Sequence, residues 1–251
     1  MRRRAFLRGA ASLCVTPASA QTSIKNARAL SGDRFVLGEE EFELADIIAP
    51  PLYTLGAKPS AYFEPARHTL QIFLSGGVEV EDVAEKTRWG VRVVTAKTAG
   101  LEETLQEALV ARGAVRVAPL SDDTDLIVRL LEFEKTARES RLGLWGLNAY
   151  RIFDAARAED AIGGYNLIEG AVKRATKTRQ RFYLNFGEDY KTDFTAGAVS
   201  RIYRRWTKVG FDLAELEGAR VRIRGFVDEI NGPSIDLKHP KQIELLSAET
   251  V

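Results

Sequence analysis

Short runs in which apolar and polar residues alternate make up much of the first 100 residues of the chain. A period of two places every second side chain on the same face of a sheet, so these runs predict β-strands. Strands are predicted at 35–37, 42–48, 77–85 and 90–97. Gly38 predicts a turn after the first strand. Pro50 and Pro51 end the second, since proline has no N–H to donate to a sheet.

Helical periodicity appears in three segments of the first half. The first is 61–74, whose regular part is predicted to begin at Pro65, as proline is well tolerated in a first turn. The second is 101–113, with an apolar face that includes Leu101 and Leu105 and a stop at Gly113. The third is 125–146, closed by two glycines.

Residues 165–251 return to the strand pattern. Five strands are predicted, at 165–176, 179–189, 190–199, 219–230 and 234–246. One short helix, 200–210, lies between the third and the fourth, and a turn is predicted at 231–233. Five strands with a helix in this place are typical of the OB-fold. Residues 150–164 are predicted to be a linker with some helix, ending at Gly163 and Gly164.

The first 20 residues have the pattern of an export signal. Arginines precede a short apolar stretch, and Ala18-Ser19-Ala20 is an A-x-A cleavage site. The run Arg3 to Arg8 is similar to the twin-arginine pattern, with an ordinary secretory signal or an uncleaved amphipathic start as alternatives. The prediction is a protein exported to the periplasm or the outside of a bacterium, with no membrane span in the mature chain. Cys14, the only cysteine, lies in this signal, so the mature chain has no thiol.

Charge divides the chain unevenly. Residues 21–163 carry 17 basic and 23 acidic side chains, a net charge of −6, whereas 164–251 carry 15 basic and 12 acidic, a net of +3. If one half contacts nucleic acid, the second half is the electrostatic candidate.

Residues 27–146 resemble the thermonuclease family, whose fold is the staphylococcal-nuclease-like OB barrel braced by three helices. The resemblance lies in "LQEALVARGAVRV", "EKTARESRLGLWG", "SGDRF…FELADIIAPP" and "RWGVRV". It implies an α+β, β-rich fold class with a nuclease-like barrel at 21–149. A second, small OB-like β-barrel is predicted at 165–251, where the sequence is similar to nucleic-acid-binding domains attached to some bacterial nucleases.

In that family two carboxylates hold Ca²⁺, two arginines neutralise the phosphate and a glutamate positions the attacking water. The resemblance implies that Asp33 keeps one metal-ligand position. The four other family positions are changed: they are occupied by Glu43 (an arginine in the family), Ile48 (the second metal aspartate), Pro51 (the glutamate) and Val91 (the second arginine). No catalytic residue and no cofactor are therefore expected.

In one alternative the protein is an active enzyme. Asp46 precedes Ile48 by two residues and so is expected on the same strand face, where it could join Asp33 and Glu43 around a cation. That arrangement would make an active Ca²⁺- or Mg²⁺-dependent nuclease with a rebuilt metal site. The competing interpretation treats these acids as solvated surface charges. His68 and His239 have no ligand-like spacing and are expected to be surface or packing residues.

Basic residues alternate or interleave with aromatic ones in the second half, as single-stranded nucleic acid binding requires. The candidate contacts are Arg179, Arg181, Tyr183, Arg204, Arg205, Arg220, Arg222 and Arg224. The last three alternate with Val221 and Ile223 and predict one basic strand face. A purely structural interpretation packs Trp206 against the barrel and leaves the arginines solvated.

The sequence thus favours an exported, thermonuclease-like protein without catalysis that binds single-stranded nucleic acid or another partner through its second half. The alternatives are the rebuilt nuclease and a structural or interaction module of the cell envelope. The identity of any protein partner is open.

Overall fold

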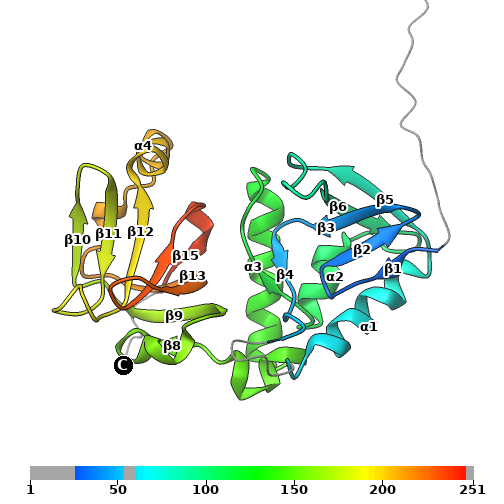
Figure 1. The fold of residues 1–251 in the computed structure, drawn as a ribbon, viewed down its shortest axis with the longest axis horizontal. Coiled ribbons are helices and arrows are strands. Elements are labelled where there is room, and N and C mark those ends of the chain that lie inside the picture. The colour runs from blue at the N-terminus through cyan, green and yellow to red at the C-terminus, as the bar shows by residue number, and fades with distance from the viewer. Residues whose placement is uncertain (1–25, 54–59, 247–251) are drawn as a thin grey trace, which may run out of the picture.

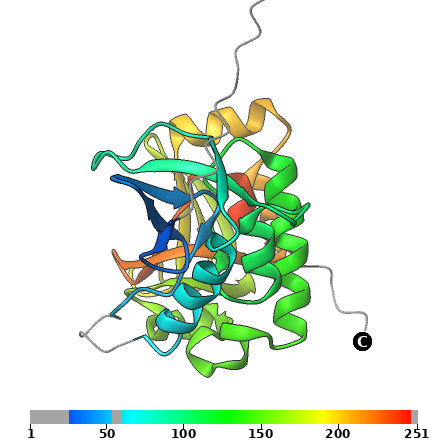
Figure 2. The same ribbon diagram turned by 90° about the vertical axis from the view of Figure 1, so that its right-hand side faces the viewer.

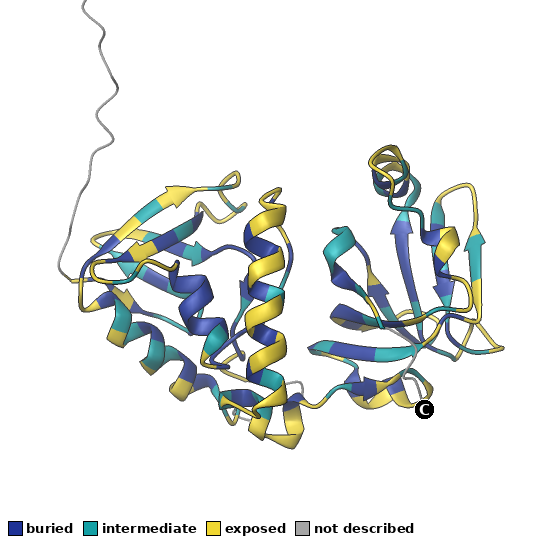
Figure 3. Cartoon of the chain, turned by 180° about the vertical axis from the view of Figure 1, so that it is seen from behind, coloured by how far each residue is buried: buried dark blue, intermediate teal, exposed yellow. Residues whose placement is uncertain are grey.

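The computed structural model describes residues 26–53 and 60–246, which form two lobes (Figure 1). The first lobe is 26–150 and the second 151–246. Each encloses its own cluster of buried apolar side chains, one between Ala27 and Leu130 and one between Phe153 and Ile243. Figure 3 shows buried residues gathered inside each lobe and exposed ones outside. The protein is α+β and rich in strands, as predicted. The export signal predicted at 1–20 lies outside the described residues.

The first lobe contains a sheet with the strand order β1-β2-β3-β6-β5. Its strands are β1 (Arg28–Ala29), β2 (Arg34–Leu37), β3 (Glu40–Leu44), β5 (Val78–Asp82) and β6 (Arg92–Thr98). β3 and β6 run parallel, and all other neighbours are antiparallel. Gly38, with φ of 64°, makes the predicted turn between β2 and β3. Phe35 and Phe42 then stack in the core with ring centroids 5.1 Å apart.

The run 42–48, predicted as one strand, is broken at Asp46, whose φ of 62° is left-handed. β3 ends at Leu44, and a separate strand β4 (Ile47–Ile48) pairs with β7 (Arg116–Val117). The prediction that Asp46 shares a strand face with Ile48 is therefore wrong, because the chain turns between them.

Three helices pack beside this sheet: α1 (Phe63–Leu74), α2 (Leu105–Ala111) and α3 (Thr124–Glu139) (Figure 2). α2 begins later than the sequence predicts. The Thr104 hydroxyl accepts the Glu107 N–H at 3.2 Å, and the Glu107 carboxylate accepts the Thr104 N–H at 2.8 Å. This capping box starts the helix after Thr104, so Leu101 lies outside it. α3 ends at Glu139, and Gly143–Gly146 forms a separate 3-10 turn, η1.

Two glycines join the end of α2 to the start of η1. A Cβ on Gly143 would lie 2.3 Å from the carbonyl oxygen of Gly113, and a Cβ on Gly113 would lie 2.3 Å from that of Leu142. Both glycines have left-handed φ angles, 62° at Gly113 and 56° at Gly143. Their backbones approach closely enough for the Leu144 N–H to donate to the Gly113 carbonyl at 2.9 Å. Both places accept only glycine.

The second lobe contains an eight-stranded sheet with the order β10-β11-β12-β14-β13-β9-β8, and β15 also pairs with β13. Its elements are β8 (Phe153–Asp154), β9 (Tyr165–Ala171), β10 (Arg174–Lys177), β11 (Arg181–Asn185), β12 (Thr195–Val199), α4 (Ser200–Lys208), β13 (Arg220–Glu229), β14 (Pro233–Asp236) and β15 (Ile243–Leu245). The predicted turn joins β13 to β14, with positive φ at Asn231 and Gly232.

The segment 150–164, predicted as a linker, belongs to the second lobe from residue 151 onward. β8 pairs in parallel with β9, and Phe153, Ala158 and Ala161 belong to the second core. A 3-10 segment, η3 (Ala155–Ala161), connects them. The sequence signal was weak because two residues of strand and a distorted helix produce no clear period.

The two sheets share one strand order. Numbered along the chain, β1, β2, β3, β5 and β6 of the first lobe lie in the order 1-2-3-5-4, and so do β10 to β14 of the second. In both lobes the third and fifth strands are parallel, and a helix lies between the third and the fourth. Among the described residues neither sheet is closed into a barrel by strand pairing.

A search for a helix able to cross a membrane, made over the residues that the structure describes, found none of sufficient length and apolarity.

Replacing Gly143 with alanine should lower the free energy of unfolding by at least about 3 kcal/mol, because strain from the left-handed φ adds to a backbone collision. Chemical denaturation would measure the loss. Gly210→Ala is the matched control. Its φ is 83°, but nothing lies within 4 Å of the added Cβ, so it should lose only about 1 kcal/mol. Equal losses in the two variants would contradict the close approach of the two glycine backbones.

Candidate functional site

Asp33, the residue that the resemblance places at a metal-ligand position, stabilises a turn. Its carboxylate accepts the Ser31 hydroxyl at 2.5 Å through one oxygen and the Ala49 N–H at 2.7 Å through the other. The second bond ties the β1–β2 turn to the chain after β4. Asp33 therefore has a structural task that needs no cation.

Asp46 also accepts hydrogen bonds through both oxygens, and it is 2% exposed. The donors are the Leu120 N–H at 2.7 Å, the Ser121 N–H at 2.8 Å and the Ser121 hydroxyl at 2.6 Å. Three hydrogen bonds satisfy a buried carboxylate. They also turn Asp46 toward the loop before α3, away from any joint site with Asp33.

Glu43 is half-buried on β3 beside like charges. Burial raises the pKa of its carboxyl above the ordinary value, and Asp33 raises it further, against the opposing effect of Arg34. Arg34 lies 3.8 Å from Glu43 and closer to Glu41. This arginine is already engaged by carboxylates, so an incoming phosphate would meet mainly negative charge.

The three other positions named from the resemblance carry apolar side chains, which cannot bind a metal ion or a phosphate. Ile48 is half-buried in β4, Pro51 is exposed, and Val91 is buried before β6. In the part of the chain that the structure describes, no group of three or more His, Cys, Asp or Glu side chains is placed to hold a metal ion. The structure thus brings Asp33 and Glu43 together and leaves Asp46 apart.

Arg220, Arg222 and Arg224 do not form the exposed basic face that their alternation predicted. Only Arg220 is exposed, and it lies 3.8 Å from Glu169. Arg222 is covered and pairs with Glu169 at 2.5 Å and with Glu244 at 2.8 Å. The Arg224 side chain is 1% exposed. Arg222 and Arg224 are therefore removed from the candidate nucleic-acid contacts, since carboxylates and the first lobe occupy their donors.

These arginines belong to an interlobe charge cluster, defined by Glu134 and Arg138 on α3, Glu169 on β9, Arg222 and Arg224 on β13, and Glu244 on β15. Arg224 lies 2.7 Å from Glu134 and also pairs with Glu244. It donates to the Val117 carbonyl at 3.1 Å, which also accepts the Tyr165 hydroxyl at 2.9 Å. The cluster therefore connects α3 and β7 of the first lobe to β9, β13 and β15 of the second.

Electrostatics in the cluster favour the ionised forms of Glu244 and Arg224. Burial alone would raise the pKa of Glu244, but the guanidiniums of Arg224 and Arg222 outweigh it and hold that pKa below the ordinary value. Burial would likewise lower the pKa of Arg224, and Glu134 and Glu244 raise it instead. Each buried charge depends on a partner from another element.

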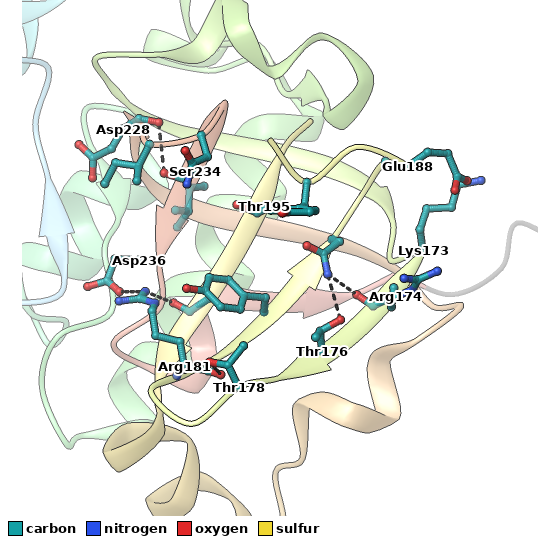
Figure 4. Close-up of a pocket in the computed structure, with 18 residues that line it drawn as sticks. Lys173, Arg174, Thr176, Thr178, Arg181, Glu188, Thr195, Asp228, Ser234 and Asp236 are labelled. Atoms are coloured by element: carbon teal, nitrogen blue, oxygen red, sulfur yellow. Dashed lines mark hydrogen bonds and ion pairs between the residues drawn. The ribbon is translucent and has the colours of Figure 1, made fainter. Parts of the chain in front are cut away.

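The outer face of the second sheet holds a groove of about 810 Å³ across β10, β11, β12 and β14. Its lining is Lys173, Arg174, Thr176, Thr178, Arg181, Tyr183, Asn185, Gly187, Glu188, Tyr190, Thr195, Gly197, Asp228, Ile230, Asn231, Ser234, Ile235 and Asp236. Figure 4 shows Lys173, Arg174 and Glu188 at one end and Asp228, Ser234 and Asp236 at the other. Two predicted contacts, Arg181 and Tyr183, line it.

Tyr183 lies across a glycine in the floor of the groove. It is paired with Gly197 on β12, and a Cβ there would lie 3.0 Å from the Tyr183 Cδ1 atom. Because Gly197 has no side chain, the Tyr183 ring can pack directly against the backbone of β12, and Tyr183 stays half-exposed. Arg181 lies beside the Tyr183 ring, with its guanidinium 5.8 Å from the ring centroid. The same guanidinium donates to Asp236 at 2.5 Å and to the Gly197 carbonyl at 3.0 Å.

The pattern of basic and aromatic residues in the sequence does not single out several groove residues, among them Asn185, Tyr190 and Asp236. Asn185 could have been found, since it continues the outward series of Arg181 and Tyr183 on β11. Asp236 could not, because β14 is far away in sequence and reaches the groove only by pairing in parallel with β12.

The remaining predicted contacts lie near one end of the second lobe. Arg179 is exposed in the loop between β10 and β11. Arg204 and Arg205 are exposed on α4, where they line a hollow of about 430 Å³ with Arg201 and Lys208. Tyr203 and Trp206 of the same helix are buried in the second core, as the structural interpretation of Trp206 expected.

No protein-family model matches the chain, and a search of curated proteins gave no match either. The chemistry of both lobes therefore has to be argued from their own residues.

Glu244→Gln should lower the free energy of unfolding by about 3 kcal/mol at pH 7, because it leaves Arg224 and Arg222 without one of their carboxylates. The folded-state pKa of Glu244 is depressed. Its contribution is therefore complete above the unfolded-state pKa and is lost as the pH falls through the folded-state value. The variant and the wild type should converge in acid, as measured by denaturation at pH 7 and at pH values below about 4. A difference that stays constant with pH would contradict the charge interaction.

Proposed function

We propose that this protein is a non-catalytic relative of the thermonuclease fold, built from two OB-type barrels, that binds an extended ligand in the groove of its second lobe. The shared 1-2-3-5-4 strand order, with the helix after the third strand, supports the fold. In the second lobe, β9 and β10 are separated only by Val172 and Lys173. One bent segment therefore contributes to both ends of the strand order, which is how an OB barrel closes.

The absence of catalysis is supported by what the retained carboxylates do. Asp33 and Asp46 both accept hydrogen bonds through each of their oxygens. Arg92, next to the changed position Val91, pairs with Asp82 at 2.8 Å and Glu40 at 3.1 Å, so it is not free to replace a phosphate clamp. Export remains a prediction from residues 1–20.

The observation that carries the binding proposal is the half-exposed Tyr183 ring on Gly197, in the floor of a groove with Lys173 and Arg174 at one end. A ring supported from below can stack a nucleobase, which contributes roughly 1–3 kcal/mol per base. The two cations would then contact the adjoining phosphates. The ligand class that fits is a short stretch of single-stranded nucleic acid.

A second candidate ligand is suggested by the groove's balance of charge. The lining contains three basic side chains, Lys173, Arg174 and Arg181, and three acidic ones, Glu188, Asp228 and Asp236. Thr176, Thr195 and Asn185 add neutral donors and acceptors. Such a lining also suits an uncharged, hydroxyl-rich ligand, and OB-folds bind oligosaccharides as well as oligonucleotides.

Tyr183→Ala should weaken binding of a six-residue oligo(dT) by about tenfold, a single-base stacking loss within the range for such platforms. Tyr183→Phe keeps the ring and should bind like the wild type. Fluorescence anisotropy at low salt would measure both affinities, and a neutral oligosaccharide would serve as a competitor. Equal binding by Tyr183→Ala would exclude the tyrosine platform, and efficient competition would favour the sugar ligand.

The mature chain should cleave neither DNA nor RNA, single- or double-stranded, with Ca²⁺, Mg²⁺ or Mn²⁺, because no arginine remains to clamp the phosphate. Gel assays beside Asp33→Ala would test this. Metal-dependent cleavage that disappears in Asp33→Ala would instead establish the rebuilt nuclease.

A further inference from the structure

Four cations share the outer face of α4. Arg201, Arg204, Arg205 and Lys208 follow the spacing i, i+3, i+4, i+7, which places them on one side of a helix. The opposite side carries Tyr203 and Trp206 into the core. All four cations are exposed and together line the hollow of about 430 Å³ on this helix. We call this surface the α4 basic face.

The α4 basic face gathers four cations, without a carboxylate partner among the described residues, on one side of a single helix. Eleven arginines pair with carboxylates in the described residues, including Arg34 and Arg92 in the first lobe and Arg181 in the groove. None of the four α4 cations has a carboxylate within 4.0 Å in the part of the chain that the structure describes. Their only side-chain hydrogen bond runs from Arg204 to the Ser200 carbonyl at 3.1 Å. Positive charge is thus concentrated here without internal neutralisation.

The aromatic residues of this helix do not take part in the surface. Tyr203 is 6% exposed and donates to Asp212 at 2.8 Å, and Trp206 is 4% exposed and packs edge-on against Phe211. The sequence pattern of interleaved aromatic and basic residues had suggested base stacking here. With both rings buried, this face offers charge alone, and charge alone recognises phosphates but not bases.

We propose that the α4 basic face binds the phosphate backbone of a polynucleotide, whether single- or double-stranded. Charge complementarity supports this occupant: four cations on about two turns of helix surface match a regularly spaced polyanion. Arg179 extends the face, because its carbonyl accepts the Ser200 hydroxyl at 3.1 Å at the start of α4. The same loop leads to Thr178 and Arg181 at the groove, so a long strand held in the groove could continue onto α4.

The proposal shares with the proposed function the assumption that the protein meets a polynucleotide, but it does not need the groove. A duplex cannot stack an unpaired base on Tyr183, so duplex binding reports the α4 basic face. A six-residue oligo(dT) reports the groove. The two proposals can therefore fail separately.

The experiment measures binding of the mature chain to a duplex of about 20 base pairs over a series of salt concentrations. The test variant replaces all four cations, Arg201→Gln, Arg204→Gln, Arg205→Gln and Lys208→Gln. The matched control removes the same charge from exposed positions of the first lobe, by Lys86→Gln, Arg88→Gln, Lys97→Gln and Lys135→Gln. Thermal unfolding checks that each variant is folded, and the pairs 201/204 and 205/208 provide smaller changes.

The α4 variant should lose at least about tenfold in duplex affinity at low salt. The slope of log affinity against log salt should fall by about 3.6, since each of the four phosphate contacts contributes about 0.9. The control variant and Tyr183→Ala should bind the duplex like the wild type. The α4 variant should still bind the six-residue oligo(dT).

The proposal is overturned if the wild type does not bind the duplex, or if the α4 variant and the control variant lose affinity equally. It is also overturned if vesicles containing phosphatidylglycerol, but not the duplex, bind in a way that depends on the four cations, because the occupant would then be an anionic lipid surface.

Discussion

Arg224 carries a full positive charge at a place where it is 1% exposed, between carboxylates of two different lobes. A buried charge without partners is strongly unfavourable, so Glu134 on α3 and Glu244 on β15 have to stay within reach. Neither partner lies on β13, the strand that carries Arg224. An ion pair of this kind adds little net stability over apolar packing. Any arrangement that separates the partners, however, leaves a buried charge unpaired and is strongly destabilised. The relative position of α3 and β13 thus depends on it, and the shared acceptor Val117 reinforces the same junction through Tyr165.

This junction decides which charges remain for other purposes. Arg222 and Arg224 are paired with carboxylates at the interlobe junction, where Arg138 also lies 3.6 Å from Glu134. The groove, with its balanced charges around Tyr183, and the α4 basic face both stay open to solvent on the second lobe. Both surfaces lie on parts of the second lobe that the interlobe charge cluster does not use. The modest net charge of the second half therefore conceals a strongly basic helix surface.

The first lobe shows that carboxylates considered as metal ligands from the sequence can have structural tasks instead. Asp33 connects the β1–β2 turn to the segment after β4, and Asp46 anchors the loop before α3. Each satisfies backbone N–H groups that would otherwise lack partners in a tight turn. Such carboxylates have a structural reason to persist whether or not a phosphate is ever bound, so their presence is no argument for chemistry.

The sequence by itself predicted the features that depend on local interactions. Alternation identified the longer strands but missed the two-residue strands β1, β7 and β8. Gly113 marked the end of α2, and Asn231 and Gly232 made the hairpin turn. Each of these depends on a few neighbouring residues. Three features were decided only by the tertiary structure: the break at Asp46, the inclusion of 150–164 in the second core, and the burial of Arg222 and Arg224. Periodicity tells which side chains share a face of an element, but not what covers that face. For β13 the covering groups are carboxylates on α3, β9 and β15, brought there by chain folding over long sequence separations.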